Sequence, residues 1–159
     1  MKRAICMNPK TPKESTITIV QQMTHQDANL AGNVHGGTIM KLIDNTGGIV
    51  ASRHAGCLVV TASIDRLDFH SPVYIGDLLR LKASVNYVGT TSMEVGVRVE
   101  AENFITGEVR HTASAYLTFV ALDENGHPKK IPPLLPESED EKRRYQEAEI
   151  RRKKRLEHK

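Results

Sequence analysis

The sequence predicts an α+β fold in which one long helix packs across a single antiparallel sheet. Two observations lead to this prediction. Apolar residues recur at helical spacing over residues 37–54, and four segments between residues 58 and 122 alternate apolar and polar residues. Because this alternation gives each strand one apolar and one polar face, the sheet should bury one face against the helix and leave the other in water.

The length and composition fit one globular domain. The chain has 159 residues, of which 39% are hydrophobic and 26% are charged. It contains no apolar run long enough to span a membrane and no apolar stretch near its start that is typical of a secretory signal. We therefore expect a cytoplasmic protein that does not enter a membrane.

The remaining composition argues against other classes of protein. Cys6 and Cys57 have no metal-ligand spacing, so we expect neither a structural disulfide nor a metal site. Tryptophan is absent and aromatic residues make up 4%, which argues against single-stranded nucleic acid as a partner. The net charge of +3 adds no support for nucleic-acid binding, because residues 137–159 alone hold nine Lys/Arg and seven Asp/Glu.

We expect three regions along the chain. Residues 1–14, with two prolines and few apolar residues, should form a flexible N-terminal arm. Residues 15–127 should form the folded domain, which begins with a Thr-, Ile- and Val-rich strand over 15–23 and continues through a polar, glycine-containing loop over 24–36. Residues 128–159 should form a proline-rich bridge and a charged C-terminal helix.

The long helix follows the loop and should end at Gly56. Gly47 and Gly48 lie inside it, where each glycine costs about 1 kcal/mol relative to alanine. A close neighbour crossing that face would explain the pair. The residues expected to share the buried face of the helix are Ile39, Leu42, Ile43, Thr46 and Val50.

Four strands should follow, over residues 58–69, 77–89, 92–103 and 108–122. The two middle strands alternate most clearly. The residues expected to face the core are Leu79, Leu81, Ala83, Val85 and Tyr87 in the first of these, and Met93, Val95, Val97 and Val99 in the second.

The C-terminal helix should be solvent-facing, because it is almost wholly polar. Ser138 and Glu141 form a capping-box pattern, and Glu147–Arg151 and Glu149–Lys153 have the spacing of ion pairs within a helix. The run RRKKR at 151–155 is also similar to a basic patch for an anionic surface, although the interspersed glutamates favour a solvated helix.

The segment GNVHGGTIMKLID, residues 32–44, offers the clearest chemistry. Gly36 and Gly37 precede the helix, whose unpaired N–H groups and partial positive charge suit an oxyanion or a carbonyl oxygen. Asp44 follows about two turns later on nearly the same side as Gly37, which would place a carboxylate over the same pocket. Asn33 has an amide that can orient a water or a carbonyl.

The same residues also have purely structural interpretations. A glycine pair before a helix often only makes the turn, and an aspartate is most often exposed. Asn33 has the residue type of a turn or a cap. His35 invites assignment as a general base, but the sequence places no partner beside it, so we expect it to shape the turn.

At these residues the sequence resembles a known family. The segment 29–54, NLAGNVHGGTIMKLIDNTGGIVASRH, is similar to the signature of hotdog-fold acyl-CoA thioesterases, the cytosolic long-chain and brain-type acyl-CoA hydrolases, as a single-hotdog bacterial-type member. The stretches VVTASIDRLDFHSPVYIGDLL, YVGTTSMEVGVRVEAEN and TASAYLTFVALDENGHPKKIPPLLP resemble the same family. The resemblance runs from about residue 15 to residue 136.

The resemblance implies a hotdog fold, in which the sheet wraps the long helix, and hydrolysis of fatty acyl-CoA to fatty acid and coenzyme A. It implies a homodimer with active sites shared between subunits, assembled further as a trimer of dimers. Asp44 of one subunit matches the catalytic carboxylate, as general base or nucleophile, and Asn33 of the other matches its asparagine partner. The N–H groups near Gly37 match the oxyanion donors.

No cofactor is implied, because coenzyme A is part of the substrate and product. Its phosphates need basic groups around them, and the candidates for the substrate-binding set are His35, Gly36, Arg53, His54 and Arg66, with Lys82 and Arg98 as further basic residues.

Two other functions stay open. One is a non-catalytic acyl-CoA-binding or regulatory domain, because binding and hydrolysis of a thioester need the same pocket. The other is an acyl-thioester dehydratase, because FHSPVYIGD at 69–77 superficially resembles a histidine-containing segment of those enzymes.

Overall fold

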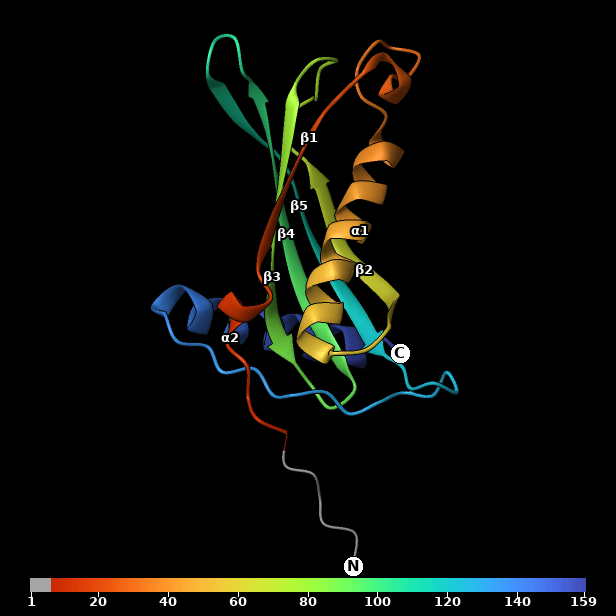
Figure 1. The fold of residues 1–159 in the computed structure, drawn as a ribbon, viewed down its shortest axis with the longest axis vertical. Coiled ribbons are helices and arrows are strands. Elements are labelled where there is room, and N and C mark those ends of the chain that lie inside the picture. Colours follow the sequence, from red (N-terminus) through yellow and green to blue (C-terminus); the bar gives the residue numbers. More distant parts are fainter. Residues whose placement is uncertain (1–6) are drawn as a thin grey trace, which may run out of the picture.

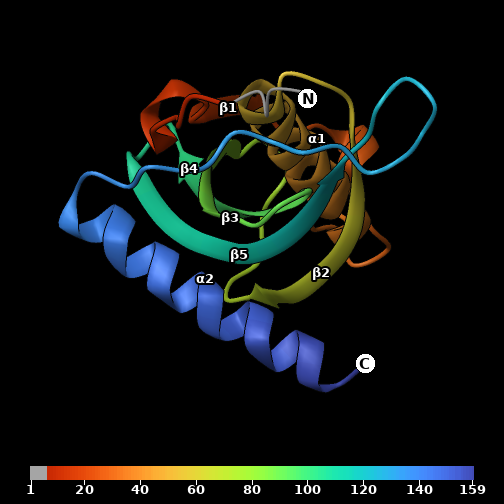
Figure 2. The ribbon, with the colours of Figure 1, turned by 90° about the horizontal axis from the view of Figure 1, so that it is seen from below.

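The computed structural model describes residues 7–159 and contains one five-stranded sheet curved around a long helix (Figures 1 and 2). The strand order is β1-β3-β4-β5-β2, and every neighbouring pair is antiparallel. The predicted α+β class and element order are confirmed. In chain order the elements are η1 Pro12–Glu14, β1 Ile17–Gln22, η2 His25–Asp27, α1 Gly36–Ala55, β2 Val59–Phe69, β3 Leu78–Val88, β4 Ser92–Asn103, β5 Glu108–Ala121 and α2 Glu139–Glu157.

The core lies between α1 and the concave face of the sheet (Figure 2). Alternate residues of β3 and β4 point into it, as the sequence pattern predicts, and Leu79, Leu81, Val95 and Val99 are fully buried. Helix α1 contributes Ile39, Ile43, Thr46, Gly47, Val50, Ala51, His54 and Ala55. It ends at Gly56 in the left-handed conformation, with φ 69°.

The expected close neighbour of the glycine pair is Phe119 on β5. A Cβ atom built on Gly47 would lie 3.1 and 3.2 Å from two ring carbons of Phe119, whereas one built on Gly48 would meet that ring at 3.8 Å. Gly47 therefore lets the helix approach the sheet to a distance that a side chain would prevent.

The two glycines predict opposite effects of alanine. Gly48→Ala should raise the free energy of unfolding by up to about 1 kcal/mol, because alanine favours the helix and finds room. Gly47→Ala should lower it, because Phe119 is 2% exposed and cannot move aside without disturbing the core. Urea denaturation of both variants measures the difference. Equal stabilisation by the two would contradict this account of the contact.

One residue of β3 faces the opposite way from the prediction. The pairing of β3 with β4 shifts register between Val85 and Tyr87, as in a β-bulge. Tyr87 consequently packs on the outer face of the sheet, where its ring lies 4.9 Å from the ring of Tyr145 in α2. Val88 is buried, at 7% exposed.

Helix α2 is not the free, solvent-facing helix that the sequence predicted, although its Ser138–Glu141 capping box is confirmed. It crosses the outer face of the sheet (Figure 2). Arg151 donates two hydrogen bonds to Glu94 on β4, at 3.0 and 2.7 Å, and its guanidinium stacks 3.7 Å from the ring centre of Tyr116. Glu94 is only 3% exposed, so its charge is compensated by α2.

The ion pairs within α2 also differ from the expected ones. Glu147 pairs with Arg143, at 3.1 Å, because Arg151 is held by Glu94. Arg155 forms an ion pair with Asp65 of β2. Two arginines of the run at 151–155 therefore attach the helix to the sheet.

Removing the Arg151 side chain should destabilise the protein strongly. Arg151→Ala leaves the Glu94 carboxylate buried without its partner, which typically costs about 3–5 kcal/mol. The matched control is Lys153→Ala on the same helix, since Lys153 is exposed and should change stability by less than about 0.5 kcal/mol. Thermal and urea denaturation measure both. Similar, small effects of the two substitutions would show that α2 is not held by this pair.

The C-terminal bridge holds the described part of the N-terminal arm. The Lys10 N–H donates to Pro133 O and the Leu135 N–H donates to Lys10 O, both at 2.9 Å. The Lys10 ammonium donates to the carbonyl of His54, at 3.0 Å. Residues 1–6 of the predicted arm lie outside the described residues. Within residues 7–159, neither helix has the length and apolar character needed to cross a membrane.

Candidate active site

The start of α1 is organised by His35. Its backbone N–H donates to Asp27 O at 2.7 Å, and its Nδ1 accepts the N–H of Gly37 at 2.9 Å. His35 is thus the N-cap, which agrees with its predicted structural role. The structure differs from the expectation for Gly37, because the N–H proposed as an oxyanion donor is occupied by His35. Within residues 7–159, the Gly36 N–H has no hydrogen-bond acceptor.

A cavity of about 410 Å³ opens beside this helix end. Its volume is within the usual range for small-molecule sites. It brings together the loop before α1, the first residues of α1 and the segment after β2. The lining residues are Asn29, Asn33, Val34, Gly36, Ile39, Phe69, His70, Ser71, Pro72 and Val73.

The two asparagines of the loop have different surroundings. Asn29 Oδ1 accepts the N–H groups of Ala31 and Asn33, at 2.9 and 3.1 Å. Because both bonds are donated by backbone N–H groups, they show which atom of the Asn29 amide is the oxygen. The amide nitrogen has no acceptor within the described residues and is free to donate into the cavity. The loop is held from behind by the Val34 N–H, which donates to Val73 O at 2.9 Å.

Asp44 lies elsewhere on the helix. Its Oδ1 accepts a hydrogen bond of 2.6 Å from the hydroxyl of Thr61 on β2. It does not line the cavity, and its distance from Gly36 along the helix is about 12 Å at 1.5 Å per residue. A single chain therefore does not place the carboxylate over the pocket at the helix N-terminus, where the helical spacing from Gly37 predicts it. The resemblance implies that Asp44 and Asn33 come from different subunits, and that stays a prediction.

The surface around Asp44 is apolar and has an open strand edge. Within residues 7–159, β2 is the last strand of the sheet and pairs only with β5, so the other edge of its eleven residues is unpaired there. Met40 of α1, one turn before Asp44, and Val60 and Ile64 of β2 are 41%, 47% and 39% exposed. A long, apolar strand edge of this kind is a template for another strand.

The basic residues proposed for the phosphates of coenzyme A are dispersed. His54 is fully buried, and its Nε2 lies 2.7 Å from Pro132 O and must donate to it. Burial lowers the pKa of His54, so the imidazole is neutral at neutral pH and has no charge to offer a phosphate. This removes His54 from the predicted substrate-binding set.

Arg66 pairs with Asp68 on β2 at 2.5 Å with its side chain 72% exposed, and Arg53 is exposed near the end of α1. Lys82 and Arg98 lie on the outer face of the sheet, where both pair with Glu100. Within residues 7–159, no three His, Cys, Asp or Glu side chains are grouped as a metal site would need.

Comparisons with known proteins agree with the fold. Residues 31–107 match the family described as the thioesterase superfamily. The cytosolic acyl coenzyme A thioester hydrolase of Mus musculus is 37% identical over 145 residues, which cover 90% of this chain. The match covers 38% of the mouse protein, so this chain spans well under half the length of that curated relative.

Solved structures are similar over nearly the whole chain. A hexameric acyl-CoA thioesterase without ligand superposes with a TM-score of 0.92 at 39% identity, covering 96% of this chain and 97% of that one. An acyl-CoA hydrolase from Staphylococcus aureus, in complex with butyryl coenzyme A, coenzyme A and coenzyme A disulfide, has a TM-score of 0.88 at 41% identity and covers 94% and 91%.

Three variants of the Staphylococcus aureus hydrolase have alanine in place of an asparagine, an aspartate and a threonine at positions 28, 43 and 60, that is, with separations of 15 and 17 residues. Asn29, Asp44 and Thr61 have the same residue types and the same separations in this chain. Neither Asn29 nor Thr61 is among the site residues that the sequence predicts. Nothing in one sequence ranks Asn29 above Asn33, and Thr61 is recognisable only through its hydrogen bond to Asp44.

Proposed function

This chain belongs to the thioesterase superfamily, and from that premise we propose that it hydrolyses the thioester of fatty acyl-CoA to a free fatty acid and coenzyme A. One observation carries the proposal. The carboxylate of Asp44 is oriented by Thr61 on an open apolar face, and both residues, with Asn29, have the spacing of the three residues replaced in the Staphylococcus aureus variants.

In the proposed reaction Asp44 activates the attack on the thioester carbonyl. It takes a proton from a water molecule that adds to the carbonyl carbon, or it adds to that carbon itself and forms an anhydride that water then hydrolyses. The C–S bond breaks and coenzyme A leaves as a thiolate, which is a good leaving group and needs no strong general acid. The Thr61 hydroxyl fixes one carboxylate oxygen of Asp44 and leaves the other for the reaction.

We assign the asparagine role to Asn29 in preference to Asn33. The 15-residue separation from Asp44 supports this choice, as does the amide nitrogen of Asn29 that is left free to donate by the bonds to its oxygen. The open N–H of Gly36 at the same cavity is the better-placed donor to the carbonyl oxygen, because the Gly37 N–H is bonded to His35. Donors at a helix N-terminus stabilise the negative charge that develops on that oxygen.

The proposed site needs a second copy of the chain. Pairing of β2 with the β2 strand of another copy would satisfy the open edge, bury the apolar residues around it and bring Asp44 of one subunit to the cavity of the other. The hexameric state of the similar thioesterase supports a further assembly of three such dimers. The cytosolic naming of the mammalian relative supports a cytoplasmic location.

Substitution of Asp44 and Thr61 tests the proposed chemistry. Asp44→Asn should lower kcat for an acyl-CoA by at least about a hundredfold, because the amide is neither base nor nucleophile. Thr61→Val should lower it by about tenfold, through loss of the hydrogen bond that orients the carboxylate. The measurement is release of free thiol, and Thr90→Val, at an exposed position that lines neither cavity, is the matched control.

The same assay separates the three functions. A hydrolase liberates the coenzyme A thiol, a dehydratase changes the acyl group without liberating thiol, and a binding domain only retains the ligand. Absence of thiol release by the wild-type chain, together with tight binding of acyl-CoA, would reject the hydrolase in favour of a binding domain. Full activity of Asp44→Asn would exclude Asp44 from the mechanism.

Subunit mixing tests the shared site. Inactive Asn29→Ala and Asp44→Ala subunits, mixed in equal amounts, should recover up to about a quarter of wild-type activity, because each mixed dimer holds one intact site. Subunit exchange is followed by mass spectrometry. The matched mixture uses Asn33→Ala in place of Asn29→Ala, and Asn33→Ala alone should stay largely active. If activity did not recover although the subunits had exchanged completely, Asn29 and Asp44 would belong to a site within one subunit.

A further inference from the structure

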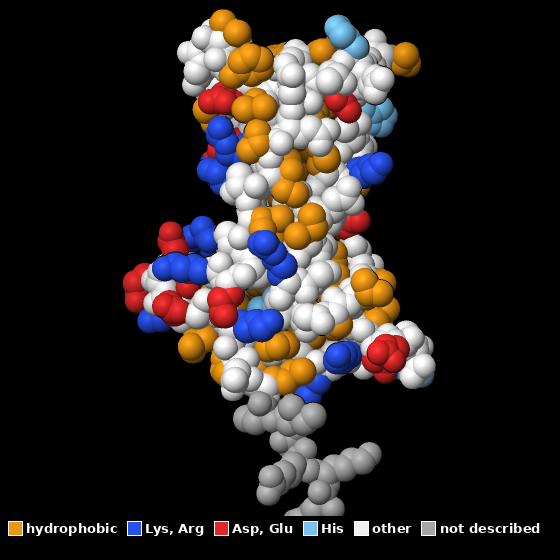
Figure 3. All heavy atoms as spheres, viewed as in Figure 1, with side chains coloured by type: hydrophobic (Ala, Val, Ile, Leu, Met, Phe, Trp, Pro, Cys, Tyr) orange, Lys and Arg blue, Asp and Glu red, His pale blue; other side chains and the backbone are white. Residues whose placement is uncertain are grey.

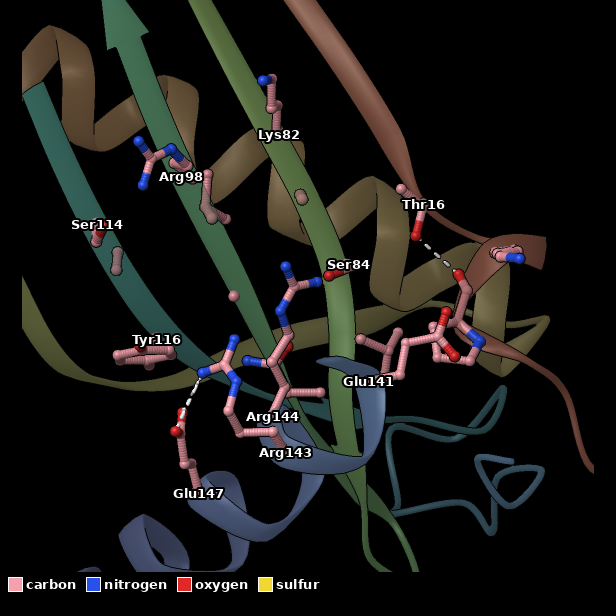
Figure 4. Close-up of a pocket in the computed structure, with 18 of the residues that line it drawn as sticks. Thr16, Lys82, Ser84, Arg98, Ser114, Tyr116, Glu141, Arg143, Arg144 and Glu147 are labelled. Carbon is pink, nitrogen blue, oxygen red and sulfur yellow. Dashed lines mark hydrogen bonds and ion pairs between the residues drawn. The ribbon is translucent and has the colours of Figure 1, made fainter. Parts of the chain in front are cut away.

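A second, larger cavity lies on the outer face of the sheet, under α2. It has a volume of about 490 Å³ and is bounded by η1, the outer residues of β3, β4 and β5, and the first half of α2 (Figure 4). Charged side chains gather over η1 and the start of α2, at the lower left of Figure 3. Because α1 and Asp44 lie on the concave side of the sheet, this outer groove is separate from the proposed active site (Figure 2).

The outer groove carries a surplus of positive charge. Its lining contains six basic side chains and two carboxylates. Glu141 accepts the backbone N–H groups of Glu137 and Ser138, and Glu147 pairs with Arg143, so both carboxylates are engaged. The basic residues of the lining are Lys13, Lys82, Arg98, Arg143, Arg144 and Arg151.

The surplus persists after nearby acidic residues are counted. Arg151 is compensated by Glu94, and Lys82 and Arg98 share the single carboxylate of Glu100, at 3.2 and 3.1 Å. With Asp140, which pairs with Arg143 at 3.5 Å, five carboxylates face six cations. Within residues 7–159, Lys13 and Arg144 have no acidic partner. The groove thus presents two cations without an ion-pair partner, which suits the negative charge of a phosphate monoester.

The floor of the groove is small and polar. Ser84 on β3 pairs in register with Gly96 on β4, and the polar side chain of Asn86 lies over Gly96. Ser114 on β5 lies beside Arg98, across β4 from Ser84. Arg143 and Arg144 extend toward the strands from α2 on one side of this floor, and Lys82 and Arg98 lie on the other side (Figure 4). Hydroxyl donors on a flat floor between two groups of cations suit phosphate oxygens.

Docking of α2 does not account for these cations. The helix is attached to the sheet through Arg151 with Glu94 and Tyr116, and through Arg155 with Asp65. Arg144 takes no part in those contacts and is exposed. An unpaired guanidinium held at the edge of a concave polar site is the arrangement that recognises an anion.

We propose that the outer groove binds the phosphate group of a phosphorylated small molecule, with Arg144 and Lys13 supplying the uncompensated charge and Ser84 a hydroxyl. The phosphate can come from a free nucleotide or from coenzyme A itself, and the experiment below distinguishes these sources. The proposal does not rest on the proposed hydrolysis, because the groove and Asp44 lie on opposite faces of the sheet.

The test measures binding to the full chain by isothermal titration calorimetry at low ionic strength. The probes are inorganic phosphate, adenosine 5′-phosphate and coenzyme A. Arg144→Gln should weaken binding about tenfold, which is the usual effect of losing one charge-assisted hydrogen bond. Lys13→Gln should act in the same direction. Lys153→Gln removes one charge from the same helix outside the groove and should leave affinity within about twofold.

The three arms have distinct outcomes. Weakening of all three probes by Arg144→Gln supports a site for free phosphate compounds. Weakening of coenzyme A alone, with a raised KM and an unchanged kcat, supports the phosphates of coenzyme A as the ligand. Failure of every probe to bind, or equal weakening by Arg144→Gln and Lys153→Gln, overturns the proposal. Thiol release is measured in parallel, so an inactive chain that still binds phosphate in the groove would reject only the proposed hydrolysis.

Discussion

The contact between Gly47 and Phe119 is the constraint on which the rest of the molecule depends. It sets the distance of α1 from the concave face of the sheet, because any side chain at Gly47 would meet the phenyl ring of Phe119. With the helix at this distance, Ile43 and Val50 are buried on one side of it. Asp44, which follows Ile43, faces β2 instead of the core, and its carboxylate accepts a hydrogen bond from the hydroxyl of Thr61.

Both faces of the sheet are covered, by different kinds of interaction. The concave face is covered by apolar packing against α1. The outer face is crossed by α2, which is held by the ion pairs of Arg151 with Glu94 and Arg155 with Asp65 and by the tilted ring contact of Tyr145 with Tyr87. The free edge of β2 then remains as the uncovered apolar surface beside Asp44. One chain therefore holds the groups of the proposed active site apart. The Asp44 carboxylate lies beside the edge strand β2, and the proposed donors Gly36 and Asn29 lie at the N-terminus of α1.

The two faces of the sheet carry different groups, which suit the two different functions that we propose for them. The concave side presents a helix N-terminus, two asparagines and a carboxylate, which are groups that act on a carbonyl. The outer side presents arginines and hydroxyls around a polar floor, which are groups that hold an anion without reacting with it. A small domain can carry both sites because one sheet separates them.

The helix, the strands and the capping box could be predicted from the chain alone, because each depends on a periodicity or a spacing within a few residues. The sequence also located the segment around His35 and Asp44, because its residue pattern is distinctive. Contacts between residues that are distant in the chain become visible only in the folded protein. The polar residues of α2 look solvated until Glu94, 57 positions before Arg151, is placed beneath them. His54 looks basic until Pro132 covers it. Asn29 and Thr61 enter the proposed site only because folding places Asn29 at the cavity and Thr61 beside Asp44.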